Sequence, residues 1–192
     1  WVSTPNYEGV LGDTARIIDI CKKAGVLVVV DGSWGSELPF SRVLGPSPVQ
    51  LGADAEVGSP HKTLRAPGQA AWAWLGKDSG IPLEVFEMAT LRHKTTSKNS
   101  LFLAALDLCR RWAVHNTDAG VLANRAVIEE YAGLLPEGML VDWDAEHRAG
   151  RTIASKAIAH RLTFQAWPTG FTGYDLAARL EERGVQGAQP NL

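Results

Sequence analysis

The stretch VLVVVDGSWG, residues 26–35, decides the fold of this chain. It opens with five apolar residues, four of them the β-branched valine, and ends in a carboxylate and a glycine-flanked turn. A strand that is apolar at every position is typical of a parallel sheet with both faces covered. The run therefore predicts an α/β fold, a three-layer, mostly parallel sheet with helices on both faces.

The neighbouring segments fit this architecture. Residues 13–25 have the pattern of an amphipathic helix that Asp13 caps and Gly25 ends. Residues 55–58 and 69–75 are two further strand candidates, and the loop after the first strand is rich in Gly, Pro and Ser. Such a loop is expected to cross the edge of the sheet where the strands end.

The second half of the chain predicts mainly helices. Residues 99–115 and 121–135 each carry apolar side chains at helical spacing. Residues 162–167 alternate like a half-exposed strand, and residues 172–183 predict a helix that Thr172 caps.

A change of composition at Pro136 predicts a domain boundary. We expect residues 1–135 to be the second half of a large domain and residues 136–192 to begin a smaller α+β domain. The sequence starts at Trp1 without an initiator methionine, so we expect it to be a fragment of a longer protein.

Composition narrows the functional classes. A chain of 192 residues with 45% hydrophobic and 21% charged residues has the profile of a globular protein, not of a disordered or fibrous one. The net charge of -2 gives no electrostatic footprint for a nucleic acid or a membrane surface, which leaves small molecules and proteins as partners. Cys21 and Cys109 fit buried free thiols, so a cytoplasmic location is expected. No metal site is predicted.

Two of the predicted strands end in distinctive polar groups, Asp31–Gly35 and Ser59–Thr63. A carboxylate at the end of an apolar strand is partly desolvated and needs a cation, for which a protonated pyridine nitrogen is suitable. A lysine on the neighbouring loop can condense with an aldehyde. Asp31 and Lys62 are therefore the candidate catalytic pair, and His61 could add positive charge or contact a phosphate.

Each of these residues also has an ordinary explanation when it is taken alone. Asp31 could cap a turn, Ser59 could form one, and His61 and Lys62 could be solvated surface residues. The joint arrangement, with one motif 31 residues after the other, is what favours chemistry.

Five segments carry motifs of one known family. Ser59–Leu64 has the form Ser-x-His-Lys-x-Leu, and Val30–Gly35 resembles an Asp-x-Ala-His or Asp-x-Ala-Trp segment. Thr4–Val10, Thr95–Ser97 and Thr169–Asp175 match the remaining motifs. Together they resemble, over nearly the whole length, the major domain of the ornithine/lysine/arginine decarboxylases, a fold type I group of pyridoxal-phosphate enzymes.

The resemblance implies a role for each matching residue. Lys62 would form the imine with pyridoxal 5'-phosphate, and Asp31 would pair with the ring nitrogen. Ser33 would pack under the ring, and Trp34 would lie near the ring hydroxyl, although a core position would also suit a tryptophan. The expected phosphate contacts are Ser59, His61 and, across the interface of a homodimer or higher homo-oligomer, Thr96.

The resemblance implies α-decarboxylation of a basic or related amino acid through a quinonoid intermediate. Oxidation by dioxygen and transamination start from the same intermediate and stay open, as does a scaffold role without the cofactor. Ser33, Pro60 and Lys98–Asn99 depart from the family motifs, which leaves substrate and reaction undecided. Glu8 and Glu37 are candidates for binding a distal ammonium or guanidinium, or else are solvated carboxylates.

Overall fold

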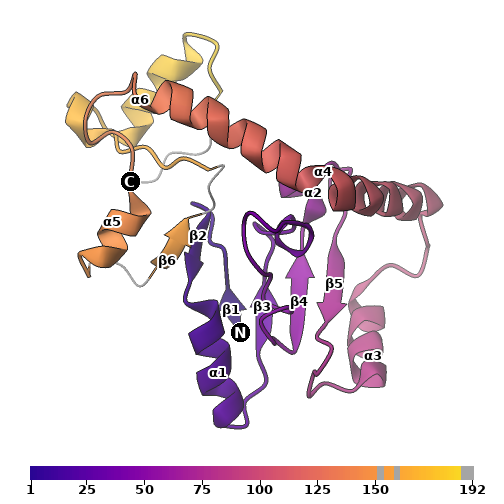
Figure 1. Cartoon of the computed structure of the whole chain (residues 1–192). Helices are drawn as coiled ribbons and strands as arrows, with labels where there is room; N and C mark the ends of the chain where they lie inside the picture. Colours follow the sequence, from indigo (N-terminus) through magenta and orange to yellow (C-terminus); the bar gives the residue numbers. More distant parts are fainter. Residues whose placement is uncertain (151–153, 158–160, 187–192) are drawn as a thin grey trace.

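The computed structural model describes residues 1–150, 154–157 and 161–186 (Figure 1). Its strands are β1 (Val2–Ser3), β2 (Val10–Gly12), β3 (Val29–Asp31), β4 (Ala55–Gly58), β5 (Trp72–Leu75) and β6 (Ala154–Ala157). Its α-helices are α1 (Thr14–Lys23), α2 (Pro60–Thr63), α3 (Leu83–His93), α4 (Ser100–Ala132), α5 (Trp143–Arg148) and α6 (Gly173–Glu181), and two short 3₁₀ turns are η1 (Leu38–Phe40) and η2 (Trp167–Thr169).

The central sheet has the strand order β1-β3-β4-β5 (Figure 1). The first three strands are parallel and β5 is antiparallel to β4, so the predicted mostly parallel sheet with helices is confirmed. Asp31 lies in register with Ser3 on one side and Val57 on the other. The carboxyl ends of β3 and β4 therefore meet at one edge. Strand β1 was not predicted from the sequence, because two residues are too few to form a recognisable pattern.

Strand β3 is shorter than the apolar run that predicted it. Val26 and Leu27 are 54% and 52% exposed, whereas Val28 and Val30 are buried. The prediction of a strand over residues 26–30 is therefore wrong in its first half. The chain must turn after α1, with Gly25 at a φ of 69°, before it can enter the sheet.

Asp54 fixes the point at which the chain enters β3. Its buried carboxylate accepts a hydrogen bond of 2.7 Å from the Val28 N–H and another of 2.7 Å from the Gly80 N–H. Burial acts to raise the pKa of this carboxyl, but the two backbone bonds and the nearby Lys22 outweigh it and hold the pKa below its usual range. The charged carboxylate thus joins two loops below the sheet.

Helix α1 forms as its sequence predicts. The side chain of Asp13 caps it by accepting from the Arg16 N–H, and Lys22 and Lys23 occupy its last turn. Its Ile18 is 3% exposed and packs against Val28, Val30 and Ala53 of the sheet region. One core cluster of the described chain therefore lies between α1 and the sheet, and a second contains Leu38, Leu44 and Val121.

Helix α4 is continuous over 33 residues, where the sequence predicted two separate helices. Polar residues between the two predicted helices make contacts that leave the helix intact. Asn116 donates from its amide to the Trp112 carbonyl one turn back. Asp118 accepts from the Ser41 hydroxyl at 2.7 Å and from the Arg42 N–H at 3.0 Å. Asp118 therefore fastens the loop after β3 to the middle of α4 and does not end the helix.

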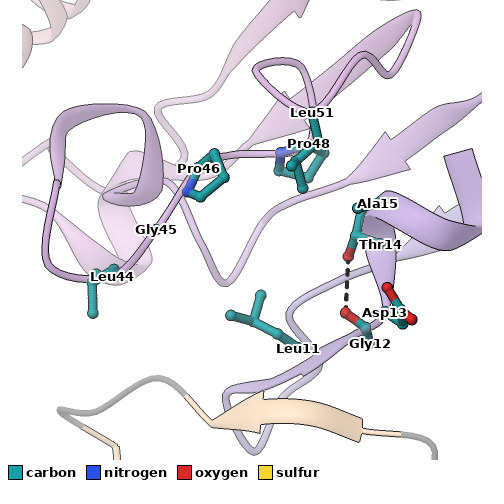
Figure 2. Close-up of a pocket in the computed structure, with 10 residues that line it drawn as sticks. All are labelled: Leu11, Gly12, Asp13, Thr14, Ala15, Leu44, Gly45, Pro46, Pro48 and Leu51. Atoms are coloured by element: carbon teal, nitrogen blue, oxygen red, sulfur yellow. Dashed lines mark hydrogen bonds between the residues drawn. The ribbon is translucent and has the colours of Figure 1, made fainter. Parts of the chain in front are cut away.

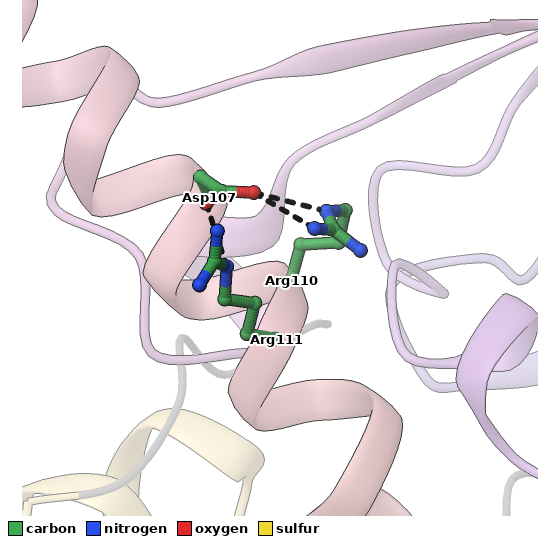
Figure 3. A network of polar contacts seen from close by, with 3 residues as sticks. All are labelled: Asp107, Arg110 and Arg111. Atoms are coloured by element: carbon green, nitrogen blue, oxygen red, sulfur yellow. Dashed lines mark hydrogen bonds and ion pairs between the residues drawn. The ribbon is translucent and has the colours of Figure 1, made fainter.

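The exposed side of α4 carries an ion-pair network (Figure 3). Asp107 accepts from Arg110 at 2.8 Å and from Arg111 at 2.8 Å, one turn further along the helix. The hydrogen bond from Arg110 is the main cause that lowers the pKa of the Asp107 carboxyl. The spacing is that of helix-stabilising pairs, so we assign the network to the helix and not to chemistry.

The C-terminal part returns to the first half of the chain. Strand β6 pairs antiparallel with β2, and Leu140 bridges to Phe164. Helix α6 begins after the predicted cap Thr172, which forms a capping box with Asp175. The predicted strand over residues 162–167 is wrong, because only the single bridge at Phe164 forms before η2 begins. The boundary near Pro136 stays a prediction, and residues 151–153, 158–160 and 187–192 of that domain lie outside the described residues.

No helix among the described residues has the length and hydropathy needed to cross a membrane. Within the same residues, His, Cys, Asp and Glu side chains do not gather into a group that could hold a metal ion.

Candidate active site

Lys62 and Trp34 meet at the edge where β3 and β4 end. The Lys62 Nζ atom lies 4.5 Å from the centroid of the Trp34 ring, and the lysine side chain is exposed. The two residues are brought together because β3 and β4 are adjacent parallel strands. The segments that follow these two strands therefore start at the same edge of the sheet. The predicted neighbourhood of the two motifs is therefore observed for this pair.

The turn after β3 presents Asp31 at this edge. The Ser33 N–H donates to Asp31 Oδ1 at 3.0 Å, and the Gly32 N–H donates to the Val57 carbonyl of β4. A side chain at Gly32 would place its Cβ 2.5 Å from Glu56 Oε1. Glycine is required here because the carboxyl group of Glu56 fills the space.

Helix α2 presents the lysine motif on one tight turn. Ser59 stands at its N-cap position but its side chain makes no capping bond, and Pro60 occupies the first helical position. His61 donates from Nδ1 to the Ala70 carbonyl at 2.7 Å, which orients the imidazole. The Thr63 hydroxyl is buried without a hydrogen-bond partner in the described part of the chain. Polar groups therefore remain available on both sides of Lys62.

Thr96 is not brought to this cluster. It is exposed on the connection between α3 and α4, and no contact of the described residues links it to Lys62 or Asp31. Its predicted role across an interface stays a prediction.

Two residues beside Trp34, Tyr7 and Arg161, were not predicted to be part of this cluster. Tyr7 packs its ring edge-on at 4.8 Å, and Arg161 donates to the Trp34 carbonyl at 2.6 Å. Arg161 Nη2 also lies 3.8 Å from the buried carboxylate of Glu37, which the sequence suggested only as a substrate-binding group. Burial lowers the pKa of Arg161, and the charge of Glu37 opposes that shift. No local pattern marks Arg161, because 127 residues separate it from Trp34.

Glu56 was also missed, although it interrupts an otherwise apolar strand. Its side chain is 1% exposed, and Oε2 accepts from the Val49 N–H at 3.2 Å. Burial raises the pKa of its carboxyl to about 7, against the lowering effect of the Val49 bond. A charged residue within the strand segment Ala55–Gly58 was the signal that could have indicated it.

A pocket of about 220 Å³ lies elsewhere, between the start of α1 and the loop after η1 (Figure 2). Its walls come mostly from small, apolar and proline residues such as Leu44, Pro46 and Leu51, and Asp13 is its acidic member. None of the predicted site residues lines it. We assign no chemistry to this pocket.

Known proteins resemble this chain along most of its length. An uncharacterized protein of Bacillus subtilis (strain 168), YaaO, is 24% identical over 185 residues, which cover 96% of this chain and 38% of that protein. An arginine decarboxylase of the same organism is 32% identical over 111 residues, 57% of this chain and 22% of that protein. The chain thus spans less than half the length of these relatives.

Solved structures share the fold. The complex of SepCysS with the SepCysE N-terminal domain matches with a TM-score of 0.55 and 14% identity, over 96% of this chain and 49% of that one. Mouse CSAD in its apo form matches with a TM-score of 0.55 and 17% identity, over 95% and 40%. The family model of the Orn/Lys/Arg decarboxylase major domain matches residues 1–132, which include Asp31, Trp34 and Lys62. This chain belongs to the Orn/Lys/Arg decarboxylase major-domain family of fold type I enzymes.

Proposed function

We propose that this chain is part of a pyridoxal-phosphate-dependent decarboxylase that removes the α-carboxyl group of a basic or related amino acid. The observation that carries the proposal is the Lys62 amine, 4.5 Å from the Trp34 ring at the edge where Asp31 ends β3. Membership of the family supports it, as do the arginine decarboxylases among the relatives.

The residues at this edge fit pyridoxal phosphate. Lys62 offers an exposed amine to an aldehyde. Asp31 Oδ1 accepts one backbone bond, and no described residue donates to its Oδ2, which leaves that oxygen for a ring N–H. The Ser59 hydroxyl does not cap α2, and the buried Thr63 hydroxyl lacks a partner among the described residues. Both are suited to an anionic oxygen.

When bound, the cofactor's protonated ring would act as an electron sink for the electron pair of the bond between the α-carbon and its carboxylate. Asp31 would keep the proton on the ring nitrogen, since a nearby carboxylate favours the charged form of that nitrogen. Lys62 would hold the cofactor and later return a proton to the α-carbon. The remaining predicted ligands would border the ring or its phosphate: Ser33, Trp34, Ser59, His61 and, from a partner subunit, Thr96.

The basic substrate class rests on the relatives and not on an acidic group at this edge. Glu37 is buried beside Arg161, so its charge is already balanced within the chain. Glu8 or residues outside this chain would have to bind a distal ammonium or guanidinium.

The attachment of the cofactor can be tested directly. Pyridoxal phosphate is added to the full-length protein, the product is reduced with borohydride, and the modified peptide is located by mass spectrometry. We expect the label on Lys62, and we expect Lys62→Ala to lower kcat by about a thousandfold or more. Lys77→Ala, which alters an exposed lysine on the turn after β5, is the control and should leave both results unchanged. A label on another lysine would contradict the proposal.

The outcome of the reaction needs a second measurement. Carbon dioxide, ammonia and oxygen are followed together while amino acids are supplied. Carbon dioxide without oxygen uptake is the expected result. Oxygen uptake would indicate an oxidative enzyme instead of a decarboxylase. Formation of a keto acid would indicate an aminotransferase.

We also propose that the protein is a homodimer that binds its amino acid as a small molecule. Helix α3 has no buried residue in this chain, and Leu83, Val85, Met88 and Leu91 on it are all more than half exposed. Apolar side chains in such number are usually covered by another subunit. Cys21 and Cys109 are free thiols, and free thiols are typical of a reducing compartment. They therefore support the proposal that the protein is cytoplasmic.

A further inference from the structure

Arg161 reaches from the C-terminal part of the chain into the turn that carries Trp34. Its Nη2 donates to the Trp34 carbonyl at 2.6 Å and lies 3.8 Å from Glu37 Oε1. The side chains of Arg161 and Glu37 are only 17% and 3% exposed. A hydrogen bond from a charged donor in such surroundings is stronger than one between neutral groups. One side chain therefore holds both ends of the segment 34–37.

The held segment determines where the indole of Trp34 lies. The Arg161 guanidinium is 5.2 Å from the ring centroid, and the Lys62 amine is 4.5 Å from the same centroid. Tyr7 contacts the ring with its edge at 4.8 Å. The indole thus lies among three side chains from three distant segments, and Lys62 is the one that carries the proposed chemistry.

The absence of a side chain at Gly9 leaves room for the side chain of Arg161. A Cβ at this position would lie 2.7 Å from Arg161 Cδ and 3.1 Å from its Cβ. The stem of Arg161 therefore passes directly against the turn at Gly9, which belongs to the same turn as Tyr7. Any side chain at Gly9 would push the stem away from Trp34.

We propose that Arg161 is a positioning residue, which fixes the Trp34 indole as the surface against which the Lys62 amine is held. The inference rests on the proposed function for its effect on catalysis, but the placement of Trp34 and Lys62 can be measured without cofactor. Arg161 acts through the carbonyl of Trp34 and through Glu37, and so connects the C-terminal part of the chain to the active site.

The first test uses Arg161→Met in the full chain, without cofactor. Hydrogen exchange measured by mass spectrometry should become about tenfold faster in the amides of residues 32–38. It should stay unchanged in β4. The Lys62 amine, released from a fixed ring, should react roughly twofold to fivefold faster with an amine-modifying reagent, relative to Lys77. Arg161→Lys keeps the stem and the charge and should restore part of both effects.

Two matched controls separate positioning from general damage. Arg148→Met removes an arginine that is 70% exposed in the same part of the chain, and it should change nothing. Gly9→Ala should reproduce the effects of Arg161→Met. Because Gly9 has a φ of 80°, Gly25→Ala, at a φ of 69° with no atom within 4 Å, gives the cost of the backbone conformation alone.

The second test uses the enzyme loaded with pyridoxal phosphate. Arg161→Met should lower kcat about tenfold or more and leave KM nearly unchanged, because the amine is misplaced and the amino acid is still bound. Equal exchange at residues 32–38 in wild type and Arg161→Met would overturn the inference, and so would faster exchange throughout the sheet, since that indicates a role in stability only. If wild type attaches no cofactor, the proposed function fails, while exchange and Lys62 labelling still decide the role of Arg161.

Discussion

Glu56 places a carboxyl group inside the sheet, next to the turn that carries Asp31. It lies in register with Val30 of β3, and Gly32 has no side chain because this carboxyl fills the space. With its pKa raised to about 7 from an ordinary 4.5, the folded protein holds the proton more tightly than the unfolded chain does. The protonated form is therefore the one that the folded core favours.

Glu56→Gln tests this consequence through the pH dependence of stability. The free energy that Glu56 contributes is fully present below pH 4.5 and is lost as the pH rises to about 7. The loss over that interval is about 3 kcal/mol for a shift of this size. Glutamine does not titrate, so the variant should lack this fall and should be more stable than wild type above pH 7. Urea denaturation at both ends of the interval measures the difference.

The control for Glu56→Gln is Glu87→Gln, at an exposed position of α3, which should keep the wild-type pH dependence. If the stability of wild type and of Glu56→Gln changed with pH in the same way, the Glu56 carboxyl would ionise as freely in the fold as in the unfolded chain.

At the residue scale, sequence reasoning can name a residue that lies within a short motif. Lys62 and Trp34 were named from their motifs, and the structure brings them together. Arg161 could not be found in this way, because its contact with Trp34 depends on how two distant segments pack. The environment of Glu56 could not be predicted in this way either, because it depends on a neighbouring turn that the strand pattern does not describe.

At the scale of elements, the same substitution should have opposite effects in a loop and in a helix. Gly76 follows β5, and a Cβ there would lie 2.2 Å from the Ala53 carbonyl oxygen, a backbone atom that cannot move aside. Gly76→Ala should therefore destabilise the fold by about 1–3 kcal/mol. Gly120 lies inside α4 with no atom within 4 Å of its Cβ position, so Gly120→Ala should stabilise by about 0.5–1 kcal/mol.

Thermal and urea unfolding of the two variants, compared with wild type, measure both the expected loss of stability in Gly76→Ala and the expected gain in Gly120→Ala. A loss of stability in Gly120→Ala would mean that α4 is not continuous at that point, as the sequence pattern first suggested.

Element prediction succeeded where caps and local patterns suffice and failed where contacts decide. Asp13 and the Thr172 capping box marked α1 and α6 correctly. The break expected after His115 does not occur, because Asp118 binds the loop at Ser41 instead of ending the helix. Strands β1 and β2 have two and three residues and are formed by their partners, so their own sequences carry little signal.

At the scale of the whole molecule, two successive helices, α3 and α4, carry many of the exposed apolar side chains of the described residues. Met88 and Leu91 on α3 and Leu101 on α4 are 51%, 53% and 81% exposed. The connection between the two helices carries Thr96, the residue that is expected to reach the cofactor of a partner subunit. Covering these helices by a second copy would bury the apolar side chains and bring Thr96 to a site at the same time.

Leu91→Glu and Leu101→Glu together should convert the proposed homodimer to a monomer, because two carboxylates would have to be buried in each half of the interface. Sedimentation velocity of the full-length protein measures this change. Val185→Glu, at a position that is 51% exposed beyond α6, should remain a dimer. The monomer should also bind pyridoxal phosphate more weakly, and Thr96→Ala should weaken binding in the intact dimer. A wild-type protein that sediments as a monomer at every concentration and still binds the cofactor would leave Thr96 without a site and the apolar helices in need of another partner.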